Sequence, residues 1–262
     1  MTKLSIIIPV YNEGRFLSRC LSSIRVDDNS EDCDEVEVIA IDDGSTDNSG
    51  EILDEWAHLF KVVHHSTNWG VSMTRNHGLS LAKGDFVTFL DADDELTGDG
   101  VDHLLTGCLA DFDILQFNHI RAYEQGFSFP RYSNEPGRYY LSGNLPQKWV
   151  LCWNKIYKRS FLSENRITFP ENVSFEEDRI FNIRALRRQP MIYCGKANTV
   201  IKHNDNKASL CHSVGREQIF SITQALMREL KDEDNSPELE RVIRKCIANV
   251  WNSPKTEKIF GG

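Results

Sequence analysis

The segment that constrains the fold of this chain most is an apolar run that is followed directly by acidic residues. Residues 86–90 read Phe-Val-Thr-Phe-Leu, which is typical of a buried β-strand, and the next four residues are Asp91, Ala92, Asp93 and Asp94. In an open α/β sheet, ligands bind beyond the carboxyl ends of the strands. Carboxylates this close repel one another unless a cation lies among them, and hard oxygen ligands suit Mg²⁺ or Mn²⁺. The alternative is a solvated acidic turn, so the neighbouring segments must decide.

The N-terminal half alternates between strand and helix. Leu4–Val10 and Val36–Ile41 are apolar enough for strands that are buried on both faces, and Lys61–His65 is a shorter strand. Amphipathic helices are expected between them. This order predicts an α/β fold with a central, mostly parallel sheet flanked by helices. Because Pro9 lacks an amide hydrogen, the first strand should end there.

The pattern becomes less regular after a helix over Val101–Leu109 and a strand over Phe112–Phe117. Residues 127–147 are rich in Pro, Gly, Tyr and Ser, which favours loops and edge strands. We expect this stretch to form the floor or flap of an acceptor-binding region.

Regular elements return in the last part of the chain. The apolar spacing in residues 149–161 predicts a helix, and residues 191–194 and 198–203 predict two late strands. Beyond Ser213 the pattern is that of amphipathic helices.

Composition narrows the class of protein. The 262 residues include 40% hydrophobic and 26% charged residues, as in a folded globular protein. The 39 acidic against 30 basic residues give a net charge of −9, which argues against general binding to nucleic acid or anionic membrane. The oligomeric state is left open.

Cysteine usage and the N-terminus bear on the compartment. The 7 cysteines contain no Cys-x-x-Cys pair, which favours reduced thiols over a zinc or redox site. The first strand meets Pro9 too early for a signal peptide or a spanning helix. We expect a cytoplasmic protein, and peripheral association with the inner face of the membrane is compatible with that.

Five segments, in this order, resemble the successive motifs of family-2 glycosyltransferases with the GT-A fold. They are Ser5–Glu13, Asp42–Asp47, Asn68–Asn76, Leu90–Asp94 and Glu177–Asp178. The resemblance extends from about Lys3 to Ser209. It implies inverting transfer of a sugar from a nucleotide-diphosphate donor, commonly UDP-linked, to a hydroxyl of a glycan or lipid-linked acceptor, as in cell-surface polysaccharide or glycan synthesis.

The resemblance assigns Pro9, Tyr11, Asn12 and Glu13 to the donor nucleotide. The Tyr11 ring offers a flat face for a nucleobase, although it is equally typical of a half-buried aromatic residue. Asn12 or Glu13 would bind the base or the ribose.

The second and third motifs complete the donor side. Asp43 resembles the carboxylate that reads a uracil imide, whereas Asp42 has the alternative of capping the next turn. Asn68, Gly70 and Arg75 match the third motif. The guanidinium of Arg75 would meet phosphate or base, and its alternative is a surface salt bridge.

The fourth motif is an Asp-x-Asp formed by Asp91, Ala92 and Asp93. By resemblance, Asp93 is the direct ligand of Mn²⁺ or Mg²⁺, and Asp91 lies nearer the ribose or sugar. Asp94 would orient them. A metal on the diphosphate would offset charge on the leaving group.

Asp178 matches the catalytic base of the family. A carboxylate at a helix N-terminus is kept ionised and oriented, so it can accept the proton of the acceptor hydroxyl. The alternative is a residue that only caps the helix.

The acceptor and diphosphate side is defined less sharply. Trp153, Asn154, Lys155 and Glu177 resemble segments that line it. Many relatives carry Arg or His before a flexible Gly-Ser segment that closes on the diphosphate. Here the stretch 202–209 reads Lys-His-Asn-Asp-Asn-Lys-Ala-Ser, and His203 or Lys202 would fill that role, with a strand-end histidine as the alternative for His203.

These expectations divide the chain into a GT-A domain over residues 1–212 and a helical extension over 213–262. Within the domain, residues 1–117 form the nucleotide-sugar half and 118–212 the acceptor half. Two other functions are weighed. A sugar-nucleotidyltransferase should carry a Gly-rich phosphate loop after its first strand, and this chain has none there. A non-catalytic sugar-nucleotide-binding protein is the other alternative.

Overall fold

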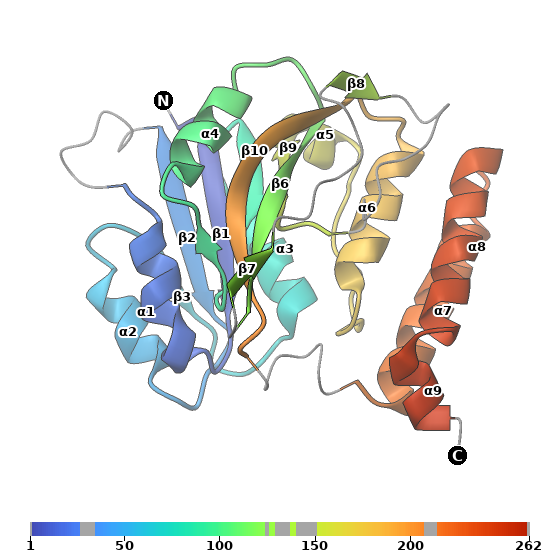
Figure 1. Cartoon of the computed structure of the whole chain (residues 1–262), viewed down its shortest axis with the longest axis horizontal. Helices are drawn as coiled ribbons and strands as arrows, with labels where there is room; N and C mark the ends of the chain where they lie inside the picture. Colours follow the sequence, from blue (N-terminus) through green and yellow to red (C-terminus); the bar gives the residue numbers. More distant parts are fainter. Residues whose placement is uncertain are drawn as a thin grey trace.

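A ten-stranded sheet with helices on its faces forms the centre of the molecule (Figure 1). The computed structural model describes residues 2–26, 35–123, 126–128, 137–139, 151–206 and 214–260. The strands are β1 (Leu4–Val10), β2 (Val36–Asp42), β3 (Lys61–His64), β4 (Phe86–Phe89), β5 (Glu95–Leu96), β6 (Ile114–Tyr123), β7 (Gly126–Ser128), β8 (Gly137–Tyr139), β9 (Lys155–Lys158) and β10 (Ile192–His203). Their order is β3-β2-β1-β4-β9-β6-β10-β5, with β7 beside β6 and β8 beside β10.

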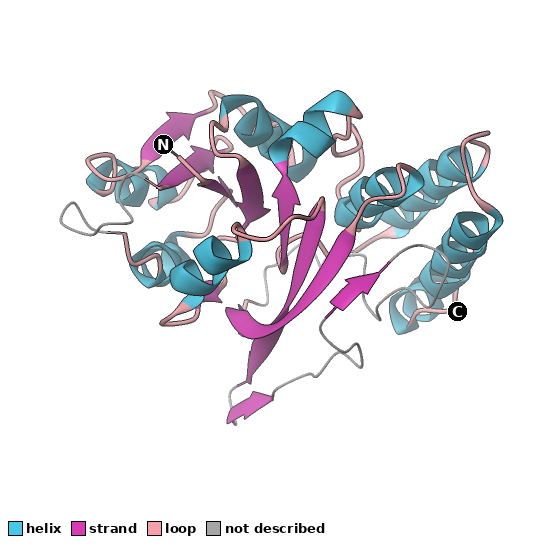
Figure 2. Cartoon of the chain, turned by 90° about the horizontal axis from the view of Figure 1, so that it is seen from above, coloured by secondary structure: helices cyan, strands magenta, loops and turns pink. Residues whose placement is uncertain are grey.

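The helices follow the strands closely in the N-terminal half and gather at the C-terminus. They are α1 (Gly14–Ser23), α2 (Ser49–Glu55), α3 (Val71–Leu81), α4 (Gly100–Gly107), α5 (Arg159–Glu164), α6 (Glu177–Arg187), α7 (Arg216–Leu230), α8 (Pro237–Trp251) and α9 (Pro254–Phe260). The last three lie at the end of the molecule away from β3, beyond α6 (Figures 1 and 2).

The predicted parallel half of the sheet is confirmed. β1 runs parallel to both β2 and β4, and β3 runs parallel to β2. The end of the first strand, predicted at Pro9, is wrong by one residue, because β1 continues to Val10. Ile7 accepts a hydrogen bond from Leu90 N, so residues 7 and 9 face β4, and β4 pairs no further than Phe89. At the position of residue 9 there is no paired residue of β4 to accept a hydrogen bond. The missing amide hydrogen of Pro9 therefore removes no hydrogen bond between β1 and β4.

The helix predicted over residues 149–161 is wrong. Of this stretch, residues 151–161 are described, and they contain β9 and the start of α5. β9 is antiparallel to β4 on one side and to β6 on the other. Pairing on both edges buries Ile156 and Tyr157 completely, so tertiary contacts override the helical spacing.

The second half of the sheet is mixed rather than parallel. β10 is parallel to β6 but antiparallel to β5 and β8. The two late strands predicted from the sequence are one strand, β10, whose register against β6 shifts between Cys194 and Asn198. Most of the predicted flap at 127–147 lies outside the described residues, as do residues 207–213.

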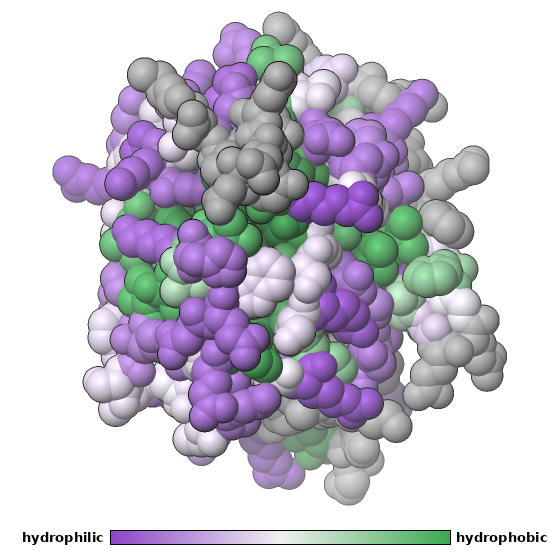
Figure 3. Space-filling view, turned by 90° about the vertical axis from the view of Figure 1, so that its left-hand side faces the viewer, coloured by the Kyte–Doolittle hydropathy of each residue, from purple (hydrophilic) through white to green (hydrophobic). Residues whose placement is uncertain are grey.

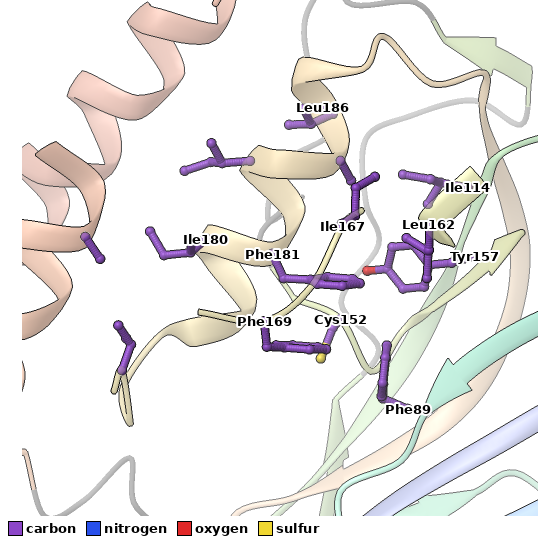
Figure 4. Packing of buried hydrophobic residues seen from close by; sticks show 14 of the residues in the cluster. Phe89, Ile114, Cys152, Tyr157, Leu162, Ile167, Phe169, Ile180, Phe181 and Leu186 are labelled. Atoms are coloured by element: carbon purple, nitrogen blue, oxygen red, sulfur yellow. The ribbon is translucent and has the colours of Figure 1, made fainter. Parts of the chain in front are cut away.

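Aromatic side chains fill the core between the sheet and α6. Phe169 stacks on Phe181 at 4.1 Å between ring centroids, and the edges of Phe89 and Tyr157 meet these rings (Figure 4). The same hydrophobic cluster includes Ile222 of α7 and other residues of α7 and α8. The C-terminal helices thus share a core with the sheet, and the boundary at 212 stays a prediction.

The surface is mostly polar on the face that includes α1 and α2. Hydrophilic side chains predominate there, with shorter hydrophobic stretches between them (Figure 3). Among the helices of the described residues, none has the length and apolar character needed to cross a bilayer.

Candidate donor and catalytic site

The parallel strands bring two acidic strand ends to one edge of the sheet. β1 lies between β2 and β4, with Val10 beside Asp42 and Ile7 beside Phe89. Asp43 directly follows β2, and Asp91 to Asp94 follow β4. The resemblance assigns both acidic ends to the donor, and this topology is consistent with that assignment.

Asp43 is held by two backbone amides and an imidazole ring. Its Oδ1 accepts hydrogen bonds from Trp69 N and His65 Nδ1, both at 2.8 Å, and its Oδ2 accepts one from Gly70 N at 2.8 Å. Gly70 has φ of 87°, a conformation that favours glycine, so the loop can turn its amides toward Asp43. The Asp43 side chain is only 4% exposed. Its Oδ1 already accepts two hydrogen bonds, so Oδ2, which accepts one, keeps acceptor capacity for a ligand N–H.

Asp42 and Asn12 serve the local backbone. Asp42 Oδ1 accepts from Ser45 N at 2.9 Å, which matches the capping alternative for this residue. Its other oxygen lies 3.0 Å from His64 Nδ1. Burial opposes ionisation, but the hydrogen bonds from Ser45 and His64 outweigh it and lower the pKa of Asp42. Asn12 Oδ1 accepts from Thr46 N at 2.8 Å.

Tyr11 and Asn68 remain available at the surface of this end. Tyr11 is 45% exposed, and Asn68 is exposed as well. An exposed ring at the end of β1 fits a stacking role better than a core role.

The second acidic end is held by charged partners. Carboxylate oxygens of Asp91, Asp93 and Asp94 lie within 4.8 Å of one another. The ammonium of Lys202, near the end of β10, lies 3.4, 3.8 and 2.8 Å from them, in the same order. Arg75 Nη2 donates to Asp91 at 2.9 Å.

The pKa values of Asp91 and Asp94 are shifted in opposite directions. Burial opposes ionisation of Asp91, but the charges of Lys202 and Arg75 outweigh it and lower the pKa of this carboxyl. Burial raises the pKa of Asp94 to about 8; Lys202 opposes the shift, and the charges of Asp93 and Asp91 add to it.

Asp93 faces one protein cation, the Lys202 ammonium, at 3.8 Å. Its Oδ2 accepts from Asn206 Nδ2 at 3.0 Å, and the same amide group lies 3.1 Å from each oxygen of Glu13. Burial and the charge of Asp93 raise the pKa of Glu13 to about 7, although the Asn206 hydrogen bond opposes the shift. Glu13 therefore faces the acidic cluster. No local pattern in the sequence singles out Asn206.

Arg75 connects the acidic strand end to α6. Its guanidinium is buried, donating to Asp91 on one side and to Glu177 Oε1 at 2.5 Å on the other, and it lies over the Phe169 ring. The surface salt bridge weighed as an alternative for Arg75 is therefore wrong. Through this residue, two carboxylates that are 86 positions apart in the sequence share one counter-ion.

Asp178 lies in the first turn of α6, next to Glu177. Burial raises the pKa of Asp178 to about 7, the charge of Glu177 adds to the shift, and Arg75 and Arg179 oppose it. A carboxylate with a pKa close to neutrality is suited to accept a proton at physiological pH.

The residues predicted for the acceptor side divide into two groups. Trp153 packs its ring edge-on to His119 and lies 5.8 Å from the Lys202 ammonium, beside the acidic cluster. Asn154 and Lys155 are buried and hydrogen-bonded to each other at 3.1 Å, and burial lowers the pKa of Lys155 to about 7. They support β9 from within.

His203 does not point at the acidic cluster with its ring. Its backbone N donates to Asp94 at 2.9 Å, whereas its Nε2 lies 2.6 Å from Glu95. Of the two candidates weighed for closure on the diphosphate, Lys202 is the one whose charge reaches the cluster.

The residues present fit a divalent cation. Three carboxylates converge, and their oxygens are the ligands that Mn²⁺ and Mg²⁺ prefer. Both oxygens of Asp94 already accept hydrogen bonds, from Lys202 and His203. Both oxygens of Asp91 do so as well, from Arg75 and Lys202. Asp93, whose Oδ1 lies 3.8 Å from the Lys202 ammonium, beyond hydrogen-bond distance, is therefore the best candidate to hold the ion.

Comparison with known proteins identifies the family. The sequence model described as "Glycosyl transferase family 2" matches residues 5–177, which is more than half of the chain. The chain belongs to this family. The matched range contains the two acidic strand ends and reaches Glu177.

Related proteins carry glycosyltransferase names. The putative glycosyltransferase EpsH of Bacillus subtilis (strain 168) is 31% identical over 194 residues, 70% of this chain and 55% of that protein. TarS of Staphylococcus aureus, named poly(ribitol-phosphate) beta-N-acetylglucosaminyltransferase, is 29% identical over 191 residues, 71% of this chain and 32% of that protein. The chain thus spans about half or less of these relatives.

Solved structures show the same fold. TarS 1–349 in complex with UDP-GlcNAc superimposes with a TM-score of 0.78 at 22% identity, covering 97% of this chain and 73% of that chain. The mannosyltransferase PcManGT from Pyrobaculum calidifontis, in complex with GDP-Man and Mn²⁺, gives 0.67 at 16% identity, covering 96% and 70%. The fold is the GT-A fold of this family.

Proposed function

We propose that this chain is the catalytic unit of an inverting glycosyltransferase that moves a sugar from a UDP-sugar to a hydroxyl of a glycan or lipid-linked acceptor. The observation that carries the proposal is the buried link from Asp91 through Arg75 to Glu177, the neighbour of Asp178. It couples a carboxylate cluster suited to a metal-bound diphosphate to a carboxyl suited to proton transfer.

Each end of the site has one task in this proposal. Asp43 accepts the imide N–H of the base, and the exposed Tyr11 ring stacks on it. Asp93 and Asp91 would hold Mn²⁺ or Mg²⁺, which when bound offsets negative charge on the diphosphate. Glu177 keeps Arg75, and through it Asp91, in place.

Asp178 performs the proton transfer. As the acceptor oxygen attacks the anomeric carbon, the Asp178 carboxylate takes its proton and the bond from that carbon to the diphosphate breaks, releasing UDP. A single displacement inverts the anomeric centre, so an α-linked donor gives a β-glycoside. A cytoplasmic location stays a prediction.

The test is UDP release from UDP-glucose and UDP-N-acetylglucosamine with Mn²⁺, alone and with poly(ribitol phosphate), the acceptor type in the names of relatives. Acceptor-dependent UDP release with a β-linked product by NMR is expected. Retained configuration would contradict inversion. Release of pyrophosphate from UTP and a sugar phosphate would favour a nucleotidyltransferase, and tight UDP-sugar binding without turnover would favour a binding protein.

A further inference from the structure

Lys202 occupies the centre of the cluster that the proposed function assigns to the metal. Its ammonium lies 2.8 Å from Asp94 Oδ2, 3.4 Å from Asp91 Oδ2 and 3.8 Å from Asp93 Oδ1. One protein cation therefore faces all three carboxylates at once.

The backbone fixes this placement. β10 pairs with β5 through Val200 opposite Leu96 and Ile201 opposite Glu95, so the next residue of β10 lies beside Asp94. The backbone amide of His203 donates a 2.9 Å hydrogen bond to Asp94 Oδ1, which holds this end of β10 against Asp94. The Trp153 ring lies on another side of the ammonium, 5.8 Å away. Lys202 is thus built into the cluster, unlike a mobile surface lysine.

A divalent cation at Asp91 and Asp93 would draw on oxygens that Lys202 already faces. Coulomb's law at a separation of about 4 Å makes the repulsion between a divalent and a monovalent cation worth more than a tenfold change in affinity, even at the dielectric constant of water. A nucleotide diphosphate brings negative charge that offsets this repulsion.

We propose that Lys202 is a resident counter-ion that suppresses metal binding by the free protein, so that the metal binds strongly only together with the donor diphosphate. The inference rests on the proposed function for the location of the metal. It adds a positioning role for Lys202 that concerns the order of binding and not the chemical step.

The experiment measures Mn²⁺ affinity by calorimetry without nucleotide, for the parent chain, Lys202→Met, Lys202→Arg and Lys231→Met. Lys231 is exposed at the end of α7, so its substitution removes the same charge far from the described contacts of the cluster. Lys202→Met should bind Mn²⁺ about tenfold or more tightly than the parent. Lys202→Arg and Lys231→Met should bind it as the parent does. Folding is checked by circular dichroism.

Unchanged or weaker Mn²⁺ binding by folded Lys202→Met would overturn the proposal. If that variant does not fold, the parent chain still tests the proposal. Its Mn²⁺ affinity should rise at least about tenfold when UDP is saturating. Equal Mn²⁺ affinities with and without UDP would overturn the proposal. The measurements without nucleotide report the effect of Lys202 on metal binding alone. A parent chain that binds no UDP in the presence of any divalent metal would instead refute the proposed function.

Discussion

The strand ends after β2 and β4 look alike in sequence, since each places neighbouring aspartates after a buried strand, but their carboxylates are held in different ways. Asp43 accepts from two backbone amides and the ring of His65. Asp91 instead accepts from the full charges of Arg75 and Lys202. Backbone amides orient a carboxylate without adding a net charge, whereas the cations beside Asp91 lower its pKa and keep this carboxyl ionised.

This difference indicates that the two strand ends bind different parts of the donor. In the proposed function, the Asp43 end binds the uncharged nucleobase and the Asp91–Asp94 end binds the metal-bound diphosphate. Substitutions at the two ends should therefore produce different phenotypes, and substitution of Asp178 should produce a third.

The largest effect is expected outside both ends. If the strand ends bind the donor and Asp178 performs the proton transfer, Asp178→Asn should lower kcat about 10²–10⁴-fold and leave UDP affinity unchanged. Asparagine keeps the size and most of the capping ability but cannot accept the proton. Turnover assays and calorimetry with UDP measure the two quantities, with Asp234→Asn on an exposed turn as the matched control.

The pH profile gives an independent check. Because Asp178 must be deprotonated and its pKa is raised to about 7, kcat should increase as the pH rises through about 7. The residual activity of Asp178→Asn should lack this step. Parental turnover in the variant would contradict the assignment of the base.

Asp93→Asn should affect binding at the charged end. Loss of a direct ligand is expected to weaken Mn²⁺-dependent UDP binding about 10²-fold, to the level seen in a chelator, without changing the preference for UDP over CDP. Calorimetry with both nucleotides, with and without Mn²⁺, measures this. If UDP affinity in the parent is the same in chelator and in Mn²⁺, the two ends do not differ as proposed.

Asp43→Ala should affect the selectivity between nucleotides at the Asp43 end of the site. Leaving a buried imide without its acceptor costs about 1–3 kcal/mol, so UDP should bind more weakly and its preference over CDP should disappear. The dependence on Mn²⁺ should remain. A variant that still distinguishes the two nucleotides as the parent does would show that Asp43 only supports the Trp69–Gly70 loop.

The smallest effect is expected at His65. His65→Leu removes one donor to Asp43 and should weaken UDP binding by about 0.5–1.5 kcal/mol, whereas His65→Asn can place an amide N–H near the position of Nδ1 and should bind nearly as the parent does. Equal losses in both variants would indicate a packing role against Trp69.

The sequence predicted what depends on neighbouring residues. The strand over residues 86–90 and its aspartates are local, so the acidic cluster and the parallel half of the sheet were predicted correctly. β9 was not, because Trp149, Cys152, Trp153 and Ile156 repeat at helical spacing while the strand is defined by pairing with β4 and β6.

The partners of the acidic residues depend on distant parts of the chain. Lys202 is 108 positions from Asp94, and Asn206 is 113 positions from Asp93. A lysine near a strand end has no local pattern that indicates a carboxylate partner. The resemblance to the family placed Arg75 near the donor, but the sequence did not show that it bridges Asp91 and Glu177.

The position of β9 between β4 and β6 sets the order in which a nascent chain can mature. Until residues 155–158 emerge from the ribosome, β4 has an unpaired edge, which is a surface open to wrong partners. The acidic cluster is complete by residue 94, but Lys202, the cation that faces all three of its carboxylates, is synthesised only 108 residues later. The N-terminal half must therefore persist by the pairing of β1 with β2 and β4 until the rest of the chain arrives.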